Sequence, residues 1–135
     1  MKVLAVDFGS KRIGLAVGNA QTRVATPLGQ IAAQNRSYAL AEILKRIGEF
    51  GIEHIVVGYP LNMDGSRGPA CSTVERFAAS LRKRSGLPVV LVDEKLSSFE
   101  AEELGKEIEA DFRKRKAFLD SMAAQVILQT YFEQS

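Results

Sequence analysis

The chain has 135 residues, of which 46% are hydrophobic, and this length and composition are typical of one globular domain with its own core. No apolar run reaches the length of a membrane-spanning helix, and the N-terminus shows no signal-peptide pattern, so we expect a cytoplasmic protein with no membrane partner. The net charge of +2 is too small to indicate nucleic-acid binding by itself, and the single Cys71 excludes an internal disulfide.

The first part of the chain predicts three strands, over residues 2–7, 12–18 and 24–31. The third strand is weak, because Pro27 and Gly29 interrupt it, and we expect it at the edge of a sheet. The connections between the three strands are short, which favours an antiparallel arrangement.

The middle of the chain alternates helices with strands. Apolar residues at helical spacing predict a helix over 40–50, stopped by Gly51, and another over 70–81, ended near Gly86. Continuous apolar runs predict strands at 54–59 and 88–93. Strands joined through helices require parallel crossovers. We therefore expect an α/β fold with a mixed five-stranded sheet, its first three strands antiparallel, flanked by helices.

The last part of the chain predicts two more helices. One covers about 98–108, and the charged segment 111–116 that follows is expected to be a loop or a frayed turn. The final helix carries an apolar face formed by Leu119, Met122, Ala123, Val126, Ile127 and Tyr131. No repeat or linker divides the chain, so residues 1–135 are expected to form a single domain.

Acidic residues stand where predicted elements begin or end. Asp7 ends the first strand, Asp93 and Glu94 end the fifth, and Asp120 opens the last helix. Ligands of such sheets collect at the carboxyl ends of strands, and carboxylate oxygens suit Mg²⁺. Each acid also has a structural explanation: Asp7 as a turn residue, Glu94 as an ion-pair partner, Asp120 as a helix cap. The residues alone leave both explanations open.

Four segments together resemble the signature blocks of the YqgF family: VDFGSKRIGLAV, VVGYPLNMDGSRGP, VDEKLSSFEAE and DSMAAQVILQTYF. They occur in the family's order and cover nearly the whole chain. The resemblance implies a ribonuclease H-like fold related to Holliday-junction resolvases of the RuvC type. It also implies a nuclease that hydrolyses phosphodiester bonds with Mg²⁺ or Mn²⁺, acting at the 5′ end of the precursor of 16S ribosomal RNA.

Carried over by motif, Asp7, Glu94 and Asp120 are the catalytic acids and metal ligands, and the loop over 62–69 lies beside the site. One position departs from the family pattern, because Lys95 stands where the family usually has arginine. Lysine keeps the charge but cannot bind phosphate in bidentate fashion, which leaves the role of position 95 open. Many ribonuclease H-like sites also take an acid from the strand that ends here at Tyr59, and this chain has none there.

Six cations are candidate contacts to nucleic acid: Lys11, Arg67, Lys95, Arg113, Lys114 and Lys116. The cluster from 113 to 116 could equally be a solvated helix end, and Lys11 a simple turn residue. The 62–69 loop has few anchors in sequence, and we expect it to move and to contact substrate. Asp64, in that loop, could reach the site. Tyr59 could stack on a base or pack in the core, and lone His54 is interpreted as structural.

We therefore expect a metal-dependent nuclease whose partner is structured RNA or branched DNA. The alternatives are a Holliday junction resolvase, which needs a two-fold dimer to make symmetric cuts, and a non-catalytic nucleic-acid binding module. Length argues strongly against an actin-like ATPase or sugar kinase, because those enzymes close two domains on ATP and 135 residues make one. The sequence does not decide between a monomer and a weak homodimer, or between Mg²⁺ and Mn²⁺.

Overall fold

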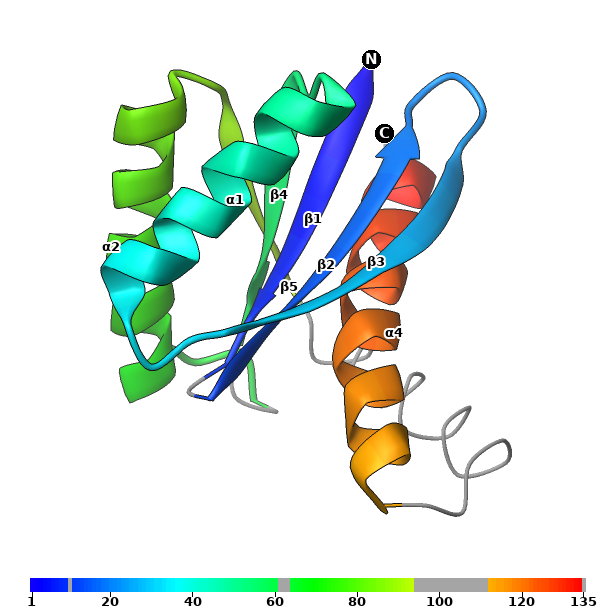
Figure 1. Cartoon of the computed structure of the whole chain (residues 1–135). Coiled ribbons are helices and arrows are strands. Elements are labelled where there is room, and N and C mark those ends of the chain that lie inside the picture. Colours follow the sequence, from blue (N-terminus) through cyan, green and yellow to red (C-terminus); the bar gives the residue numbers. More distant parts are fainter. Residues whose placement is uncertain (10, 61–63, 94–111, 135) are drawn as a thin grey trace.

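The computed structural model describes residues 1–9, 11–60, 64–93 and 112–134, and for 112–121 the backbone alone. It contains a five-stranded sheet in the order β3-β2-β1-β4-β5, with α1 and α2 on one face and α4 on the other (Figure 1). The bounds are β1 Lys2–Phe8, β2 Arg12–Asn19, β3 Val24–Ala32, α1 Arg36–Phe50, β4 His54–Tyr59, α2 Pro69–Ser85, β5 Val89–Asp93 and α4 Phe112–Gln134.

The sheet is mixed, as predicted. β1 is its central strand and pairs antiparallel with β2 and parallel with β4. β2 pairs antiparallel with β3, and β4 pairs parallel with β5. β3 is an edge strand, and its register with β2 shifts between Leu15 and Ala16, opposite the interruption formed by Pro27 and Gly29. The predicted α/β class, with a mixed five-stranded sheet whose first three strands are antiparallel, is therefore confirmed.

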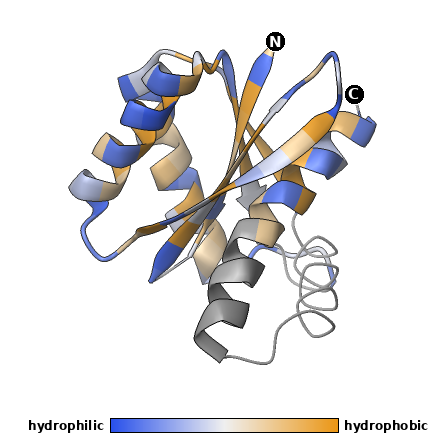
Figure 2. Ribbon diagram, turned by 45° about the vertical axis from the view of Figure 1, so that its right-hand side comes forward, coloured by the Kyte–Doolittle hydropathy of each residue, from blue (hydrophilic) through white to orange (hydrophobic). Residues whose placement is uncertain are grey.

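The helices α1 and α2 begin and end at recognisable caps. Asn35 precedes α1, and its side-chain oxygen accepts a hydrogen bond of 3.0 Å from the Tyr38 amide. Gly51 and Gly86 end α1 and α2 with φ values of 62° and 72°, a left-handed conformation that glycine adopts without strain. Both helices turn their hydrophobic residues toward the sheet (Figure 2).

The sheet face beneath α1 and α2 carries large hydrophobic side chains. The buried members of this core from the strands and from the two helices include Leu4, Val6, Ile13, Leu15, Ile55, Val57, Leu40, Ile43, Val74, Phe77 and Leu81. The rings of Phe8 and Phe77 add a tilted contact, with centroids 4.6 Å apart. This core joins β1, β2 and β4 to both helices.

The opposite face carries smaller side chains and is covered by α4. Its core contains Val3, Ala5, Ala16, Ala25, Val56 and Val92 from the strands, with Ala124, Ile127, Leu128 and Phe132 from the helix. A Cβ atom added to Gly18 would lie 2.4 Å from the Val24 carbonyl oxygen and 3.0 Å from Phe132, so α4 packs directly over this glycine.

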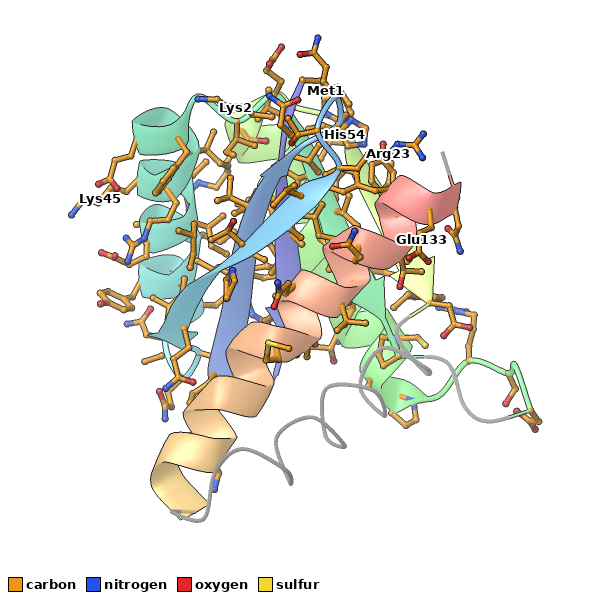
Figure 3. The ribbon with its side chains drawn as sticks, turned by 90° about the vertical axis from the view of Figure 1, so that its right-hand side faces the viewer. Met1, Lys2, Arg23, Lys45, His54 and Glu133 are labelled. Carbon is orange, nitrogen blue, oxygen red and sulfur yellow. The ribbon has the colours of Figure 1, made fainter. Side chains whose placement is uncertain are left out.

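Side-chain amides also attach α4 to the edge strand. The Nε2 atoms of Gln125 and Gln129 donate to the carbonyl oxygens of Ala25 and Arg23, at 2.8 and 3.1 Å. At the end of the helix, Tyr131 stacks on His54, with ring centroids 5.5 Å apart and its hydroxyl 3.3 Å from Nε2. Figure 3 shows α4 crossing the sheet to the edge where Arg23 and His54 lie. His54 thus has a structural contact, as expected.

Three predictions about the last part of the chain need correction or lie outside the description. The prediction of a loop or frayed turn over 111–116 is wrong from residue 112 on. Helix α4 begins at Phe112 and includes Arg113, Lys114 and Lys116. Lysine and arginine are good helix formers, so charge alone does not argue against a helix. Asp120 consequently lies inside α4 and does not open it. The helix predicted over 98–108 lies outside the described residues.

The buried stripe of α4 is also displaced from the predicted one. Ala124, Leu128 and Phe132 are buried beside the expected Ala123 and Ile127. The other expected members that are described, Met122, Val126 and Tyr131, are only partly buried. The stripe is turned toward Ala124 and Leu128, which pack on a sheet face of alanine, valine and glycine.

Candidate functional site

Asp7 lies one residue before the end of the central strand β1 and is partly buried. Side chains alternate along a strand, and Val3 and Ala5 belong to the core beneath α4, whereas Leu4 and Val6 belong to the core beneath α1 and α2. Asp7 is therefore on the α4 face of the sheet, at the edge where β1 and β4 end (Figure 1). A strand end is a rigid position for a side chain that must be held accurately.

Glycines lie on both neighbouring strands beside Asp7. Its registered partner on β2 is Gly14, and the parallel pairing of Val6 with Val57 brings Gly58 of β4 next to it on the other side. Neither glycine has a side chain to cover the carboxylate on this face. The two neighbouring strands therefore place no side chain of their own beside the Asp7 carboxylate.

The donor chemistry of Asp7 fits a hard divalent cation, because a carboxylate is the ligand type that Mg²⁺ and Mn²⁺ prefer. Within the described residues, however, no group of three histidine, cysteine, aspartate or glutamate side chains comes together. Of the three predicted ligands, Asp7 alone has a described side chain. Glu94 lies outside the described residues, and Asp120 is described by its backbone only.

The backbone places Asp120 in a definite position within α4. It precedes Ala124 by four residues, about one helical turn, and Ala124 is fully buried against the sheet. α4 runs from the edge where β1 ends toward the edge where His54 lies (Figures 1 and 3). Asp120 thus belongs to the half of the helix that is nearer to the edge carrying Asp7.

Asp93 is the last residue of β5 and pairs with Tyr59 of β4. The preceding Val92 belongs to the core beneath α4, so the alternation of the strand places Asp93 on the opposite face. Asp93 and Asp7 are therefore carboxylates at the same edge of the sheet but on different faces. Asp93 makes a natural control for any experiment on Asp7.

The turn between β1 and β2 is tight. A Cβ atom on Gly9 would lie 2.5 Å from the carbonyl oxygen of Arg12, so no other residue fits there without a shift of the backbone. Lys11, a predicted nucleic-acid contact, is exposed after this turn, and its carbonyl accepts from the Ala33 amide at 2.9 Å. The backbone of the chain itself therefore lies close to Gly9.

Arg67 is held by two partners at the end of β4. Its Nε donates to the Tyr59 hydroxyl at 2.8 Å, and its guanidinium forms an ion pair with Glu75 of α2. The Tyr59 hydroxyl donates in turn to Glu75 at 2.7 Å, and this hydrogen bond is the main cause that raises the pKa of Tyr59. The 62–69 loop is therefore anchored at Arg67, whose side chain stays 57% exposed.

The other residues predicted around the site are placed differently. Asp64 accepts from the backbone amide and hydroxyl of Ser66, at 2.9 and 2.6 Å, which is the bonding of a turn residue. Lys95 lies outside the described residues, and Arg113, Lys114 and Lys116 occupy the first turns of α4, where only the backbone is described.

One contact near the site has no counterpart among the predictions. The Arg36 guanidinium lies over the Phe8 ring, 5.6 Å from its centroid. The two residues are distant in sequence, and neither forms a recognisable motif. The sequence signal that could have located Arg36 is Asn35. Asparagine is typical of the residue before a helix, so it indicates that Arg36 is the first residue of α1.

Residues 1–134 match the family model described as RuvX: Holliday junction resolvase. The chain belongs to this family. RuvX-family relatives named "Putative pre-16S rRNA nuclease" match it over nearly their full lengths. The relative from Geobacillus kaustophilus is 42% identical over 135 residues, covering 98% of each chain. The relative from Maridesulfovibrio salexigens is 44% identical over 131 residues, covering 97% of each. These matches confirm the family predicted from the four sequence blocks.

Solved structures show the same fold at low sequence identity. RuvC of Thermus thermophilus has a TM-score of 0.63 at 15% identity, covering 99% of this RuvX-family chain and 95% of that one. The fowlpox virus Holliday junction resolvase has a TM-score of 0.60 at 15% identity, with both chains fully covered. These similarities confirm the predicted ribonuclease H-like α/β fold. No helix in the described part of this chain is long and apolar enough to span a membrane.

Proposed function

We propose that this RuvX-family chain is a cytoplasmic nuclease that hydrolyses phosphodiester bonds in the precursor of 16S ribosomal RNA. The observation that carries the proposal is the position of Asp7 between two glycines at the end of the central strand. It is supported by relatives about 40% identical over nearly the whole chain, which are named "Putative pre-16S rRNA nuclease".

In this proposal Asp7, Glu94 and Asp120 hold one or two divalent ions, Mg²⁺ or Mn²⁺. When bound, such ions supply a more acidic water as nucleophile and positive charge at the leaving oxygen of the phosphodiester. Asp7 contributes a ligand on a strand that pairs on both sides, so its position is fixed by the sheet. Gly14 and Gly58 keep side chains out of the space that the scissile phosphate needs.

The other two acids would approach Asp7 from β5 and α4. β5 presents Val92 to the α4 face and Asp93 to the opposite face, and Glu94 follows directly in the sequence. Asp120 lies one turn before Ala124, which is buried on the α4 face. The helical period of α4 therefore favours Asp120, and the pleat of β5 disfavours Asp93.

The predicted cations would bind the phosphate backbone of the RNA. Lys11 directly precedes β2 and is exposed, and Arg67 stays exposed although it is paired with Glu75. Lys95, Arg113, Lys114 and Lys116 complete the proposed set of phosphate contacts. Such contacts position a nucleic acid and carry no base information, so they suit recognition of RNA structure.

Resolution of DNA junctions is the second candidate, and it is favoured by the description of the matching family as a Holliday junction resolvase. Two symmetric cuts require two active sites related by a two-fold axis. A monomer in solution with and without a four-way DNA junction would therefore argue for the RNA substrate. We propose a monomer or weak homodimer as the resting state.

Cleavage of matched substrates tests the proposal. The purified chain is incubated with a 5′-extended 16S precursor fragment or a four-way DNA junction, in Mg²⁺, in Mn²⁺ and in EDTA. We expect RNA cleavage that needs the metal and falls at least about a hundredfold in Asp7→Asn, because a metal ligand is lost. Asp93→Asn, on the other face, should cleave like the parent chain. Equal activity of both variants would overturn the assignment of Asp7.

A further inference from the structure

A cavity of about 410 Å³ lies beneath the first turns of α1 and α2, at the same edge of the sheet as Asp7. Phe8 and Pro60 line it from the ends of β1 and β4, Gln34 and Arg36 from the start of α1, and Ala70 and Thr73 from the start of α2. Its volume lies within the usual range of small-ligand sites, roughly 300–1,000 Å³. The cavity does not include Asp7, because Phe8 packs on the α1 and α2 face and Asp7 lies on the other.

The lining combines an aromatic ring, a cation and a hydroxyl. Phe8 packs against Phe77 on one side, and the Arg36 guanidinium covers its ring. Within the part of the chain that the structure describes, no carboxylate forms an ion pair with Arg36, and its side chain is exposed at the rim. A flat guanidinium held over an aromatic ring offers a stacking surface for a base and donors for a phosphate.

The electrostatic surroundings favour an anion. The N-termini of α1 and α2 both reach this cavity, and neither helix has an acidic residue in its first turn. Gly68 precedes α2 and provides no side-chain hydrogen bond to its first amides. Glu75, one turn further along α2, is engaged by Arg67 and Tyr59. The dipoles of the two helices add to the positive charge of Arg36, which is the main attraction for an anion.

We propose that this cavity is a subsite for one unpaired nucleotide of the RNA, adjacent to the phosphodiester that is cut. The inference rests on the proposed nuclease function and adds to it a requirement for single-stranded RNA beside the scissile bond. Asp7 and Phe8 are consecutive residues, about 3.8 Å apart at Cα, and they serve opposite faces of the sheet. An RNA strand that crosses this edge would place a phosphate at Asp7 and the neighbouring base beside Arg36.

Binding without cleavage tests the subsite. A fluorescent single-stranded RNA of about twelve nucleotides, and a blunt duplex of the same sequence, are titrated in EDTA by anisotropy across a salt series. Arg36→Gln removes the charge and Ala70→Leu fills the cavity at an exposed helix position. Arg84→Gln is the matched control, because it removes an exposed arginine at the far end of α2. Thermal unfolding of each variant verifies that it folds.

We expect Arg36→Gln to weaken single-strand binding roughly five- to tenfold, the loss of one charge-assisted contact. Its slope of log affinity against log salt should flatten by about 0.7, the value for one phosphate on a single strand. Ala70→Leu should weaken single-strand binding to a similar degree without changing that slope, because it alters no charge. The duplex should bind Ala70→Leu and the parent chain equally, and Arg84→Gln should match the parent chain on both RNAs.

Two results would overturn the subsite. One is an equal loss for Arg36→Gln and Arg84→Gln, which would mean general attraction between a basic surface and RNA. The other is parental binding by Ala70→Leu, which would mean that no group enters the cavity. Cleavage by the parent chain is scored separately. If the parent chain cleaves RNA through Asp7 but either of these results is found, the proposed nuclease function stands and the subsite is wrong. If the expected binding pattern is found but the parent chain does not cleave RNA, the nucleotide subsite stands and the proposed nuclease function is wrong.

Discussion

The two faces of the sheet differ in the size of the side chains that they bury. On the face beneath α1 and α2, β1 contributes Leu4, Val6 and Phe8, whereas on the α4 face it contributes Val3, Ala5 and Asp7. The first face keeps a large side chain up to the end of the strand. The second becomes smaller and then polar toward the same edge. The first face supplies hydrophobic stabilisation, and the second carries the carboxylate of the proposed site.

This difference predicts opposite sensitivities to mutation. Removing atoms from the large-residue face should leave cavities, because its side chains are fully buried and in contact. Adding atoms to the α4 face should create clashes, because α4 packs against glycine and alanine. The predictions that follow use this contrast, from the largest expected effect to the smallest.

Phe77→Ala should produce the largest loss of stability. Phe77 is fully buried in the core beneath α1 and α2 and packs against Phe8. We expect the free energy of unfolding to fall by about 3–5 kcal/mol, from lost transfer energy and the cavity left behind. Urea denaturation of both chains measures the change. A loss below about 1 kcal/mol would mean that this face collapses around the deletion and that the contrast is wrong.

Gly18→Ala should destabilise the α4 face by an added methyl group. The new Cβ would meet the Val24 carbonyl and the Phe132 ring, so α4 or β3 must shift, at a cost of about 1–3 kcal/mol. Gly48→Ala is the control, since a Cβ there meets nothing within 4 Å on α1. It should stabilise the chain by about 0.5–1 kcal/mol, the usual gain in a helix. Effects of the same sign would contradict the proposed packing of α4.

The smallest effect should come from His54, which joins β4 to the end of α4. Burial lowers its pKa from the usual 6.5, so the folded state favours the neutral ring. Stability from this group is complete above pH 6.5 and declines as the pH falls toward the lowered pKa, because the unfolded chain takes up the proton first. His54→Phe, which keeps a ring against Tyr131, should remove this part of the decline. Identical pH profiles of unfolding free energy would show that His54 contributes none of it.

Much of the fold could be predicted because its signals are local. Apolar runs defined the strands, and glycines such as Gly51 and Gly86 marked helix ends. The start of α4 was missed because Arg113 to Lys116 looked like a solvated turn, although these residues are compatible with a helix. The rotation of its buried stripe depends on the small residues of the opposing sheet face, which only the assembled sheet reveals.

The candidate site could be predicted in part. Asp7 was identified from its place at a strand end, and the structure adds the face on which it lies. The two glycine neighbours of Asp7 could not be predicted, because Gly14 and Gly58 lie beside it only when the three strands pair in their actual register. Arg36 and Phe8 meet through the packing of α1 on the sheet, so no local pattern signalled their contact.

Helix α4 is the last element of the chain to be synthesised. All five strands, α1 and α2 precede it, so the core beneath α1 and α2 can form on a nascent chain while the opposite face still lacks its cover. A bare sheet face is ordinarily an aggregation hazard during translation. Here the uncovered surface is built from alanine, glycine and valine, which expose little apolar area. The small side chains of the sheet face that α4 later covers should therefore limit self-association of the unfinished protein.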